Sequence, residues 1–253
     1  MTTRPPAEIG MSLDEVDTPA LIVDLDAFES NLRRLAERVK GSGVRLRPHA
    51  KTHKCPVIAL KQMELGAVGV CCQKVSEAEA MVYGGVKDVL VTNEVVGRQK
   101  LRRLMGLAGS ARIGICADDP AQIADLEAAA KEASITLPVY VEINMGGNRC
   151  GVEPGEPAAE LAARVAALPG LRFEGLQGYE GNLQHVRDPA ERRQRCLTSM
   201  ERLIASRRAV ESRGLPIRIV STAGTGTHAI AGEIDGVTEV TIFTDPDLAE
   251  GIG

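Results

Sequence analysis

The chain has 253 residues, 44% of them hydrophobic and 25% charged, which is ordinary for a globular protein large enough to bury a full core. The formal net charge is −4 with both signs mixed along the chain, and this excludes a basic field for nucleic acid and a polybasic tail for a membrane. No apolar run approaches the length of a membrane span, so we expect a cytoplasmic protein whose partner is a small molecule.

The chain begins with a leader, residues 1–25, that contains one strand pattern. The apolar stretch 19–24 predicts a short buried strand. Asp26 then reads as the N-cap of an amphipathic helix over 27–40, which ends at a glycine-rich turn.

From there one unit repeats, a short apolar strand pattern followed by a helical pattern. The strand patterns lie at 44–48, 67–72, 88–92, 112–117, 139–143, 173–178, 217–220 and 237–243. The helical patterns lie at 56–65, 76–83, 97–108, 120–132, 156–168 and 189–212. Alternation of this kind indicates a parallel sheet, and eight units predict a closed (β/α)₈ TIM-type barrel over 26–243. An open doubly wound sheet is the alternative, but no Gly-x-Gly-x-x-Gly follows the first strand.

Chemistry in such a barrel sits at the carboxyl ends of the strands, where this sequence places several polar residues. Lys51 follows the first barrel strand and Gln73 the second. Arg149 follows the fifth strand, and Tyr179 and His185 follow the sixth. An arginine there can bind an anionic oxygen or simply pair with a neighbouring glutamate. Tyr179 can pack on a planar ligand, and His185 can carry a proton or cap a helix.

Lys51 lies in a basic stretch, residues 45–54, that holds three other cationic residues and two histidines. Like charges packed in a partly buried place lower a lysine's pKa and make it an amine nucleophile. A solvated basic loop is the alternative.

A second unusual stretch, residues 221–227, joins the seventh strand to a short helical pattern. Its hydroxyls and flexible backbone suit a phosphate monoester, although such turns also occur as plain loops. The residues concerned are Thr222, Gly224, Thr225, Gly226 and Thr227. The six cysteines have no zinc or redox spacing, so they predict no metal site.

Residues 47–54 read Arg-Pro-His-Ala-Lys-Thr-His-Lys, and here the likeness to a known family becomes specific. The chain resembles the D-threonine aldolase and D-serine dehydratase group of fold-type III pyridoxal-phosphate enzymes, whose barrel is of the alanine racemase N-terminal kind. Further likeness lies at residues 17–20, 73–79, 148–151, 184–185 and 224–227.

The resemblance implies a role for each strand-end residue. Lys51 would hold pyridoxal 5'-phosphate through a Schiff base, and Gln73, Arg149 and Tyr179 would line its pocket. The turn of Thr222, Gly224, Thr225, Gly226 and Thr227 would bind the phosphate. His185 would act in proton transfer or bind the substrate hydroxyl, and Tyr179 would also belong to the catalytic residues.

The implied activity is a lyase reaction of D-amino acid metabolism, the aldol cleavage of a D-3-hydroxy amino acid such as D-threonine to glycine and an aldehyde. The spacing of Tyr179 and His185 and the Gln-His pair are more similar to the aldolases than to the dehydratases of the group. A D-serine dehydratase type of ammonia-lyase is the alternative. The resemblance also implies a homodimer.

The sequence departs from the family pattern near its end. Family members continue into a β domain that supplies a His-x-Asp pair for a divalent metal, Mn or Mg. Residues 244–253 form a divergent tail instead, so we expect this domain and its metal ligands to be absent and the leader strand to lack a partner. A cofactor-binding barrel without lyase activity is therefore a further alternative, whereas a racemase is disfavoured because its second base has no candidate.

Overall fold

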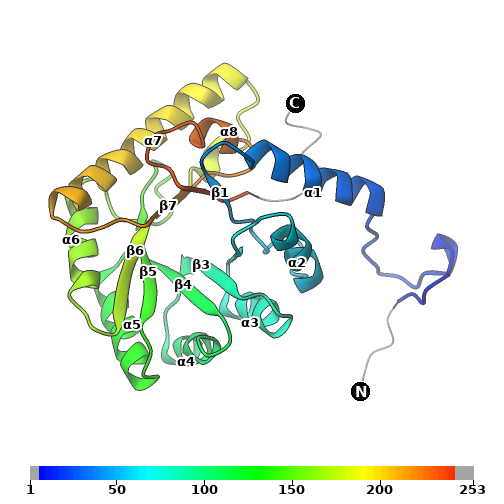
Figure 1. The fold of residues 1–253 in the computed structure, drawn as a ribbon, viewed down its shortest axis with the longest axis horizontal. Coiled ribbons are helices and arrows are strands. Elements are labelled where there is room, and N and C mark those ends of the chain that lie inside the picture. The colour runs from blue at the N-terminus through cyan, green and yellow to red at the C-terminus, as the bar shows by residue number, and fades with distance from the viewer. Residues whose placement is uncertain (1–5, 243–253) are drawn as a thin grey trace.

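The computed structural model describes residues 6–242, in which eight parallel strands form one sheet. The order around the sheet is β1-β8-β7-β6-β5-β4-β3-β2 (Figure 1). The strands are β1 Arg45–Leu46, β2 Val70–Cys72, β3 Asp88–Glu94, β4 Arg112–Ala117, β5 Leu137–Ile143, β6 Leu171–Gly178, β7 Ile219–Thr222 and β8 Glu239–Val240. The eighth predicted strand runs to residue 243, which lies, with the tail 244–253, outside the described residues.

The sheet closes into a barrel at β1. On one side β1 pairs in parallel with β8, Arg45 opposite Glu239 and Leu46 opposite Val240. On the other side the Val68 N–H donates to the Leu46 carbonyl at 2.9 Å, and bonds from the segment after β1 continue this contact up to β2. The predicted (β/α)₈ barrel is therefore confirmed, and the pairings of β8 with β1 and with β7 are its shortest ladders, with two residue pairs each.

Helices connect the strands and cover the outside of the barrel (Figure 1). They are α1 Leu25–Val39, α2 Pro56–Glu64, α3 Val75–Tyr83, α4 Arg98–Leu107, α5 Pro120–Glu132, α6 Glu156–Ala166, α7 Pro189–Ser212 and α8 His228–Ala231, with short 3₁₀ helices η1 Leu13–Glu15 and η2 Gly181–Leu183. Sequence signals explain their starts: α5 and α7 begin with a proline preceded by an aspartate whose side chain accepts backbone N–H groups. None of the described helices has both the length and the apolar character needed to span a bilayer.

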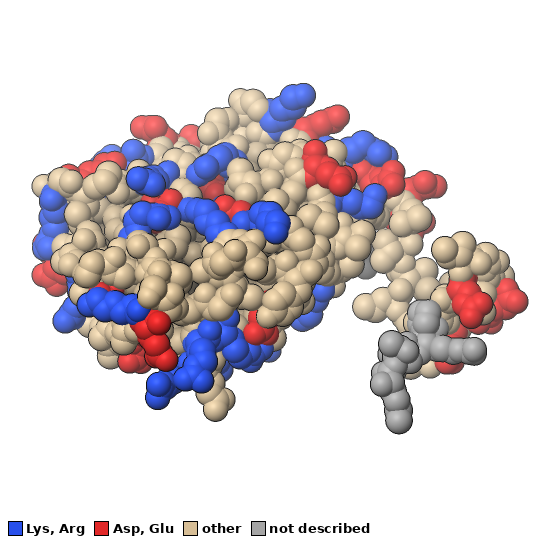
Figure 2. Space-filling view, turned by 60° about the horizontal axis from the view of Figure 1, so that its bottom comes forward, with Lys and Arg blue, Asp and Glu red and all other residues tan. Residues whose placement is uncertain are grey.

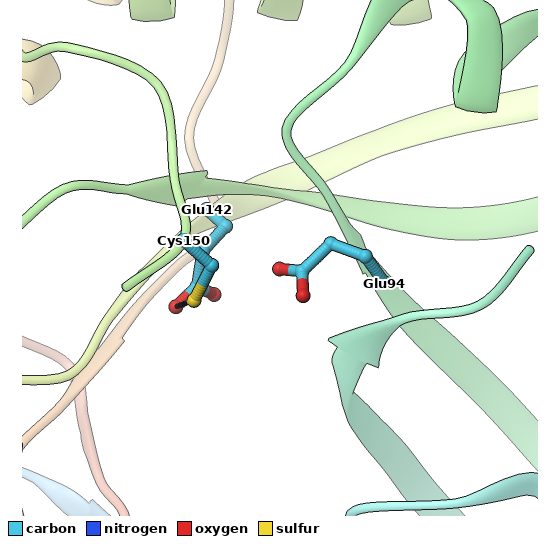
Figure 3. A group of neighbouring side chains, drawn as sticks. All are labelled: Glu94, Glu142 and Cys150. Carbon is cyan, nitrogen blue, oxygen red and sulfur yellow. Dashed lines mark hydrogen bonds between the residues drawn. The ribbon is translucent and has the colours of Figure 1, made fainter. Parts of the chain in front are cut away.

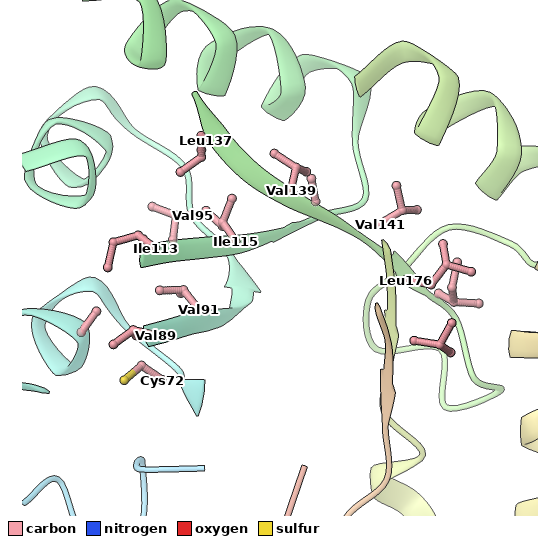
Figure 4. Packing of buried hydrophobic residues seen from close by; sticks show 14 of the residues in the cluster. Cys72, Val89, Val91, Val95, Ile113, Ile115, Leu137, Val139, Val141 and Leu176 are labelled. Carbon is pink, nitrogen blue, oxygen red and sulfur yellow. The ribbon is translucent and has the colours of Figure 1, made fainter. Parts of the chain in front are cut away.

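Strand alternation divides the core into two clusters. Val89 and Val91 of β3 belong to the larger cluster, which lies between strands and helices (Figure 4). Leu90, between them, points to the other face. It packs inside the barrel in a smaller cluster completed by Cys71, Cys116, Tyr140 and Ile219.

Ion pairs extend this interior toward the amino ends of the strands. Arg47 is 1% exposed, and its Nε donates to Glu239 at 2.7 Å while its Nη1 donates to Asp88 at 2.6 Å. Arg112 bridges Asp88 to Glu174. Where β1 meets β8, the interior of the barrel is therefore filled by these ion-paired side chains instead of apolar ones.

The leader differs from its prediction. Residues 20–24 form no strand, and the side chains of Leu21, Ile22 and Val23 are exposed. No strand among residues 6–242 pairs with this segment, so its backbone stays outside the sheet. The helix cap was also predicted wrongly: the Asp24 carboxylate, rather than Asp26, accepts from the Ala27 N–H at 2.9 Å, so α1 starts two residues earlier than expected.

Candidate functional site

A cavity opens at the carboxyl ends of the strands, where the prediction placed the chemistry. It is lined by His49, Lys51, Gln73, Thr92, Arg149, Gln177, Tyr179, Ala223 and Thr241. Four residues expected at the site from sequence, Lys51, Gln73, Arg149 and Tyr179, thus come together from four different strand ends. Sequence reasoning missed His49, Thr92, Gln177 and Thr241. Of these, His49 could have been found from its place two residues before Lys51 in the motif.

Lys51 is half-buried, and the pKa of its amine is lowered by a different cation from those that the sequence predicted. Burial is the main cause that lowers its pKa, and the positive charge of Arg149 is the second. Arg47 contributes no crowding because its guanidinium is turned into the barrel interior against Glu239 and Asp88. The cation that acts on Lys51 therefore comes from the loop after β5 and not from the basic stretch itself.

Arg149 is held in place by an aromatic ring. Its guanidinium carbon lies 5.2 Å from the centre of the Tyr179 ring, which is cation–π geometry. Burial raises the pKa of Tyr179, so its hydroxyl keeps its proton at neutral pH. Tyr179 and Arg149 together form one wall of the cavity.

His49 lies beneath Lys51 as a neutral ring. Burial and the charge of Lys51 lower its pKa to about 3. Its Nδ1 accepts from the Lys51 backbone N–H at 3.3 Å, and its Nε2 lies 3.2 Å from the Thr92 hydroxyl. His49 therefore fixes the backbone at Lys51 without adding charge to the site.

The turn after β7 adjoins the cavity through Ala223, and its two threonine side chains point away from the solvent. The Thr222 and Thr227 side chains are fully buried, and both hydroxyls donate to the carboxylate of Glu180. The Gly226 N–H donates to the Gln184 side-chain oxygen at 2.7 Å. The helix that follows, α8, has only four residues, so its dipole adds little to anion binding.

His185 stands apart from this group. It is exposed on the loop after η2 and is not among the residues that line the cavity. Its role in proton transfer stays a prediction.

A group of three further side chains lies near Arg149 and was not predicted. Glu94, Glu142 and Cys150 come from β3, β5 and the loop after β5, and their oxygen and sulfur atoms lie within 4.8 Å of one another (Figure 3). Glu142 is buried, and burial together with the charge of Glu94 raises its pKa well above the ordinary value. Burial also raises the pKa of Cys150 to about 11. Burial therefore favours the protonated forms of this group, whereas the charge of Arg149 acts in the opposite direction on Glu94 and Glu142.

Comparison with known proteins places this site in context. The family described as "Alanine racemase, N-terminal domain" matches residues 23–240. The 3-hydroxy-D-aspartate aldolase of Paracoccus denitrificans (strain Pd 1222) is 44% identical over 225 residues, and the D-threonine aldolase of Arthrobacter sp is 41% identical over 223. Each alignment covers 88% of this chain but only 58% and 59% of the respective relative.

Solved structures agree with these matches. The crystal structure of D-threonine aldolase from Filomicrobium marinum superposes with a TM-score of 0.94 at 52% identity, covering 98% of this chain and 68% of that one. The D-threo-3-hydroxyaspartate dehydratase from Delftia sp. HT23 superposes with a TM-score of 0.82 at 28% identity, covering 94% of this chain and 64% of that one.

Proposed function

Because the chain belongs to the alanine racemase N-terminal domain family, we propose that it is the cofactor-binding barrel of a pyridoxal-phosphate-dependent aldolase that cleaves D-3-hydroxy amino acids to glycine and an aldehyde. The observation that carries the proposal is Lys51, a half-buried amine with a lowered pKa at the barrel mouth beside Arg149 and Tyr179. Relatives of 41% and 44% identity that are named as aldolases support the reaction class.

The residues present fit the cofactor by their chemistry. Lys51 offers an amine for covalent attachment, Tyr179 offers a flat ring, and Arg149 offers a cation for an anionic group. The turn of residues 222–227 offers glycines that allow close approach of its backbone. When bound, pyridoxal phosphate supplies the electron sink that takes up the electrons of the breaking carbon–carbon bond.

The polar residues that line the cavity are proposed to orient the substrate. Gln73 and Thr92 carry polar groups on the wall of the cavity, and His49 stays neutral beneath the amine. His185 is proposed to take the proton of the substrate hydroxyl, by movement of its loop toward the cavity. A homodimer is part of the same proposal.

Among residues 6–242, Glu94, Glu142 and Cys150 form a group of three possible ligands for a divalent metal. Burial raises the pKa of Glu142 and of Cys150, so a cation bound there would have to displace their protons. The proposed function uses no step at this group.

The test is labelling followed by turnover. The chain is mixed with pyridoxal phosphate, reduced with borohydride and digested, and the label is expected on Lys51 and to be lost in Lys51→Ala. The unreduced protein is then given D-threonine, and glycine and acetaldehyde are measured with and without Mn²⁺. A label on another residue, or no label, contradicts the proposal.

A dehydratase is the second candidate, favoured by the D-threo-3-hydroxyaspartate dehydratase of Delftia sp. (strain HT23), which is 30% identical over 228 residues. It predicts ammonia and a keto acid in place of glycine. Label on Lys51 with neither product identifies a cofactor-binding barrel without lyase activity.

A further inference from the structure

A buried carboxylate, Glu180, lies behind the turn of residues 222–227. It follows β6 directly, beside Tyr179, and none of its surface is exposed. Among residues 6–242 no ion pair involves Glu180. An isolated buried carboxylate is unfavourable unless hydrogen bonds satisfy it, so its partners indicate why this position holds one.

Its partners include the two threonine hydroxyls of the turn, and the backbone of Ala223 also hydrogen-bonds to it. The Thr227 hydroxyl donates to one carboxylate oxygen, and the Thr222 hydroxyl donates to the other at 3.5 Å. These threonines stand at the two ends of the turn, so a single carboxylate fixes both. Both hydroxyls point to Glu180, and neither threonine is among the residues that line the cavity.

The effect of Glu180 passes through Thr227 to the backbone. The Gly224 N–H donates to the Thr227 hydroxyl oxygen at 3.1 Å, and the Gln184 amide donates to the same oxygen at 3.2 Å. Gln184 also accepts from the Gly226 N–H. A Cβ at Gly224 would lie 2.7 Å from the Gln184 side chain, so the turn is packed from behind as well as bonded. The path of the backbone thus depends on where Glu180 holds the Thr227 hydroxyl.

We propose that Glu180 is a positioning residue that shapes the 222–227 turn for the phosphate group of the cofactor, acting through the hydroxyls of Thr222 and Thr227 without touching the cofactor. This rests on the proposed function, since it takes pyridoxal phosphate as the ligand. The hydroxyls of Thr222 and Thr227 therefore support the turn from within and are not themselves assigned to the phosphate.

The test compares two ligands that differ only in the phosphate. Dissociation constants of pyridoxal phosphate and of pyridoxal are measured for the unchanged chain, Glu180→Ala, Glu180→Gln and Thr227→Val. In Glu180→Ala the preference for the phosphorylated ligand is expected to fall about tenfold or more, which is the scale of one lost charged hydrogen bond. Glu180→Gln keeps an oxygen that accepts from Thr227, so its preference for pyridoxal phosphate is expected to stay within about threefold of that of the unchanged chain. Thr227→Val is expected to lose the preference to the same extent as Glu180→Ala.

Glu127→Gln is the matched control. Glu127 on α5 is also buried and accepts a backbone N–H, that of Gly170 at 3.0 Å, but it lies away from the turn. Its substitution is expected to leave the ligand preference unchanged, with thermal unfolding followed for every variant.

The outcomes separate the two proposals. If Glu180→Ala and Thr227→Val bind both ligands more weakly by the same factor, or keep the full preference, Glu180 does not act on the phosphate turn and the inference is overturned. If the unchanged chain binds neither ligand, the proposed function itself fails.

Discussion

At the scale of single residues, the reactivity of Lys51 depends on neighbours that are distant in sequence. The basic stretch 45–54 suggested that adjacent cations lower its pKa, but the structure directs Arg47 to Glu239 and Asp88. Burial and Arg149, which is 98 positions further along the chain, take its place. The lowered pKa agrees with the prediction, the cation responsible differs from the predicted ones, and the role of Lys51 as a nucleophile stays a prediction.

Burial and the charge of Arg149 together predict how the labelling of Lys51 depends on pH. A lowered pKa means that Lys51 loses its proton at a lower pH than an ordinary lysine, so its labelling by acetic anhydride should rise at lower pH. Arg149→Met removes the positive charge but leaves the burial, and it should move the labelling midpoint to higher pH without restoring the ordinary value. The measurement is the acetylated fraction of Lys51 by mass spectrometry over a pH series.

Glu77→Gln is the opposite control. The negative charge of Glu77 raises the pKa of Lys51, so its removal should move the midpoint to lower pH. Equal midpoints in the two variants would contradict this account of the amine.

At the scale of elements, the barrel has its shortest ladders around β8, where β1 closes the ring. The pairings of β8 with β1 and with β7 have two residue pairs each, whereas β5 and β6 share seven. The buried Arg47, Glu239 and Asp88 occupy the junction of β1 and β8 and tie β1 to β8 and β3. Side-chain ion pairs therefore add to the few backbone hydrogen bonds that join β1 to β8.

Loss of Arg47 should consequently destabilise the junction of β1 and β8. Arg47→Met leaves the fully buried Glu239 without its main partner, and we expect the free energy of unfolding to fall by about 3–5 kcal/mol. Urea denaturation measures this change, and adding Glu239→Gln should recover part of it. Arg33→Ala, which breaks an exposed pair with Glu29 on α1, should leave the midpoint unchanged. A small effect of Arg47→Met would show that the junction is held by its backbone bonds.

Element by element, the sequence predicted most of the barrel because local signals determine it. Apolar strands and capped helices alternate with regular spacing, and β2 to β7 fall within or close to their predicted ranges. The failures have a common cause. Residues 20–24 have the composition of a strand, but a strand needs a neighbour, and that is not a local property. Likewise Glu94, Glu142 and Glu180 are ordinary acidic residues until the fold buries them, so no spacing in the sequence marks them as part of the site.

At the scale of the whole molecule, an apolar arm departs from a barrel of mixed surface charge. Lysines, arginines and acidic residues are interspersed over the face in Figure 2, and the segment ahead of α1 stands off the body. In this arm Ile9 and Leu21 are fully exposed, with Ile22 and Val23 also exposed. Contiguous exposed apolar side chains favour association with another surface.

We therefore expect concentration-dependent self-association through the arm. The double variant Leu21→Asp and Val23→Asp should reduce the sedimentation coefficient at high protein concentration and leave the thermal midpoint unchanged, because neither side chain belongs to the buried core. Val57→Asp, at a single exposed apolar residue on α2, is the control and should change neither quantity. Identical sedimentation of the arm variant and the unchanged chain would refute the expectation.

The pairing of β1 with β8 also determines the order in which the barrel folds during synthesis. The Arg47 N–H bonds the Val240 carbonyl, and its side chain bonds Glu239, 192 positions away in the sequence. During synthesis β1 emerges early, but its partner strand is made only after seven strands and their helices. Closing so long a loop is a slow step, so an open sheet with unpaired edges at β1 and β7 precedes the ring. The cavity around Lys51 includes Thr241, which follows β8, so it is complete only after β8 has paired with β1.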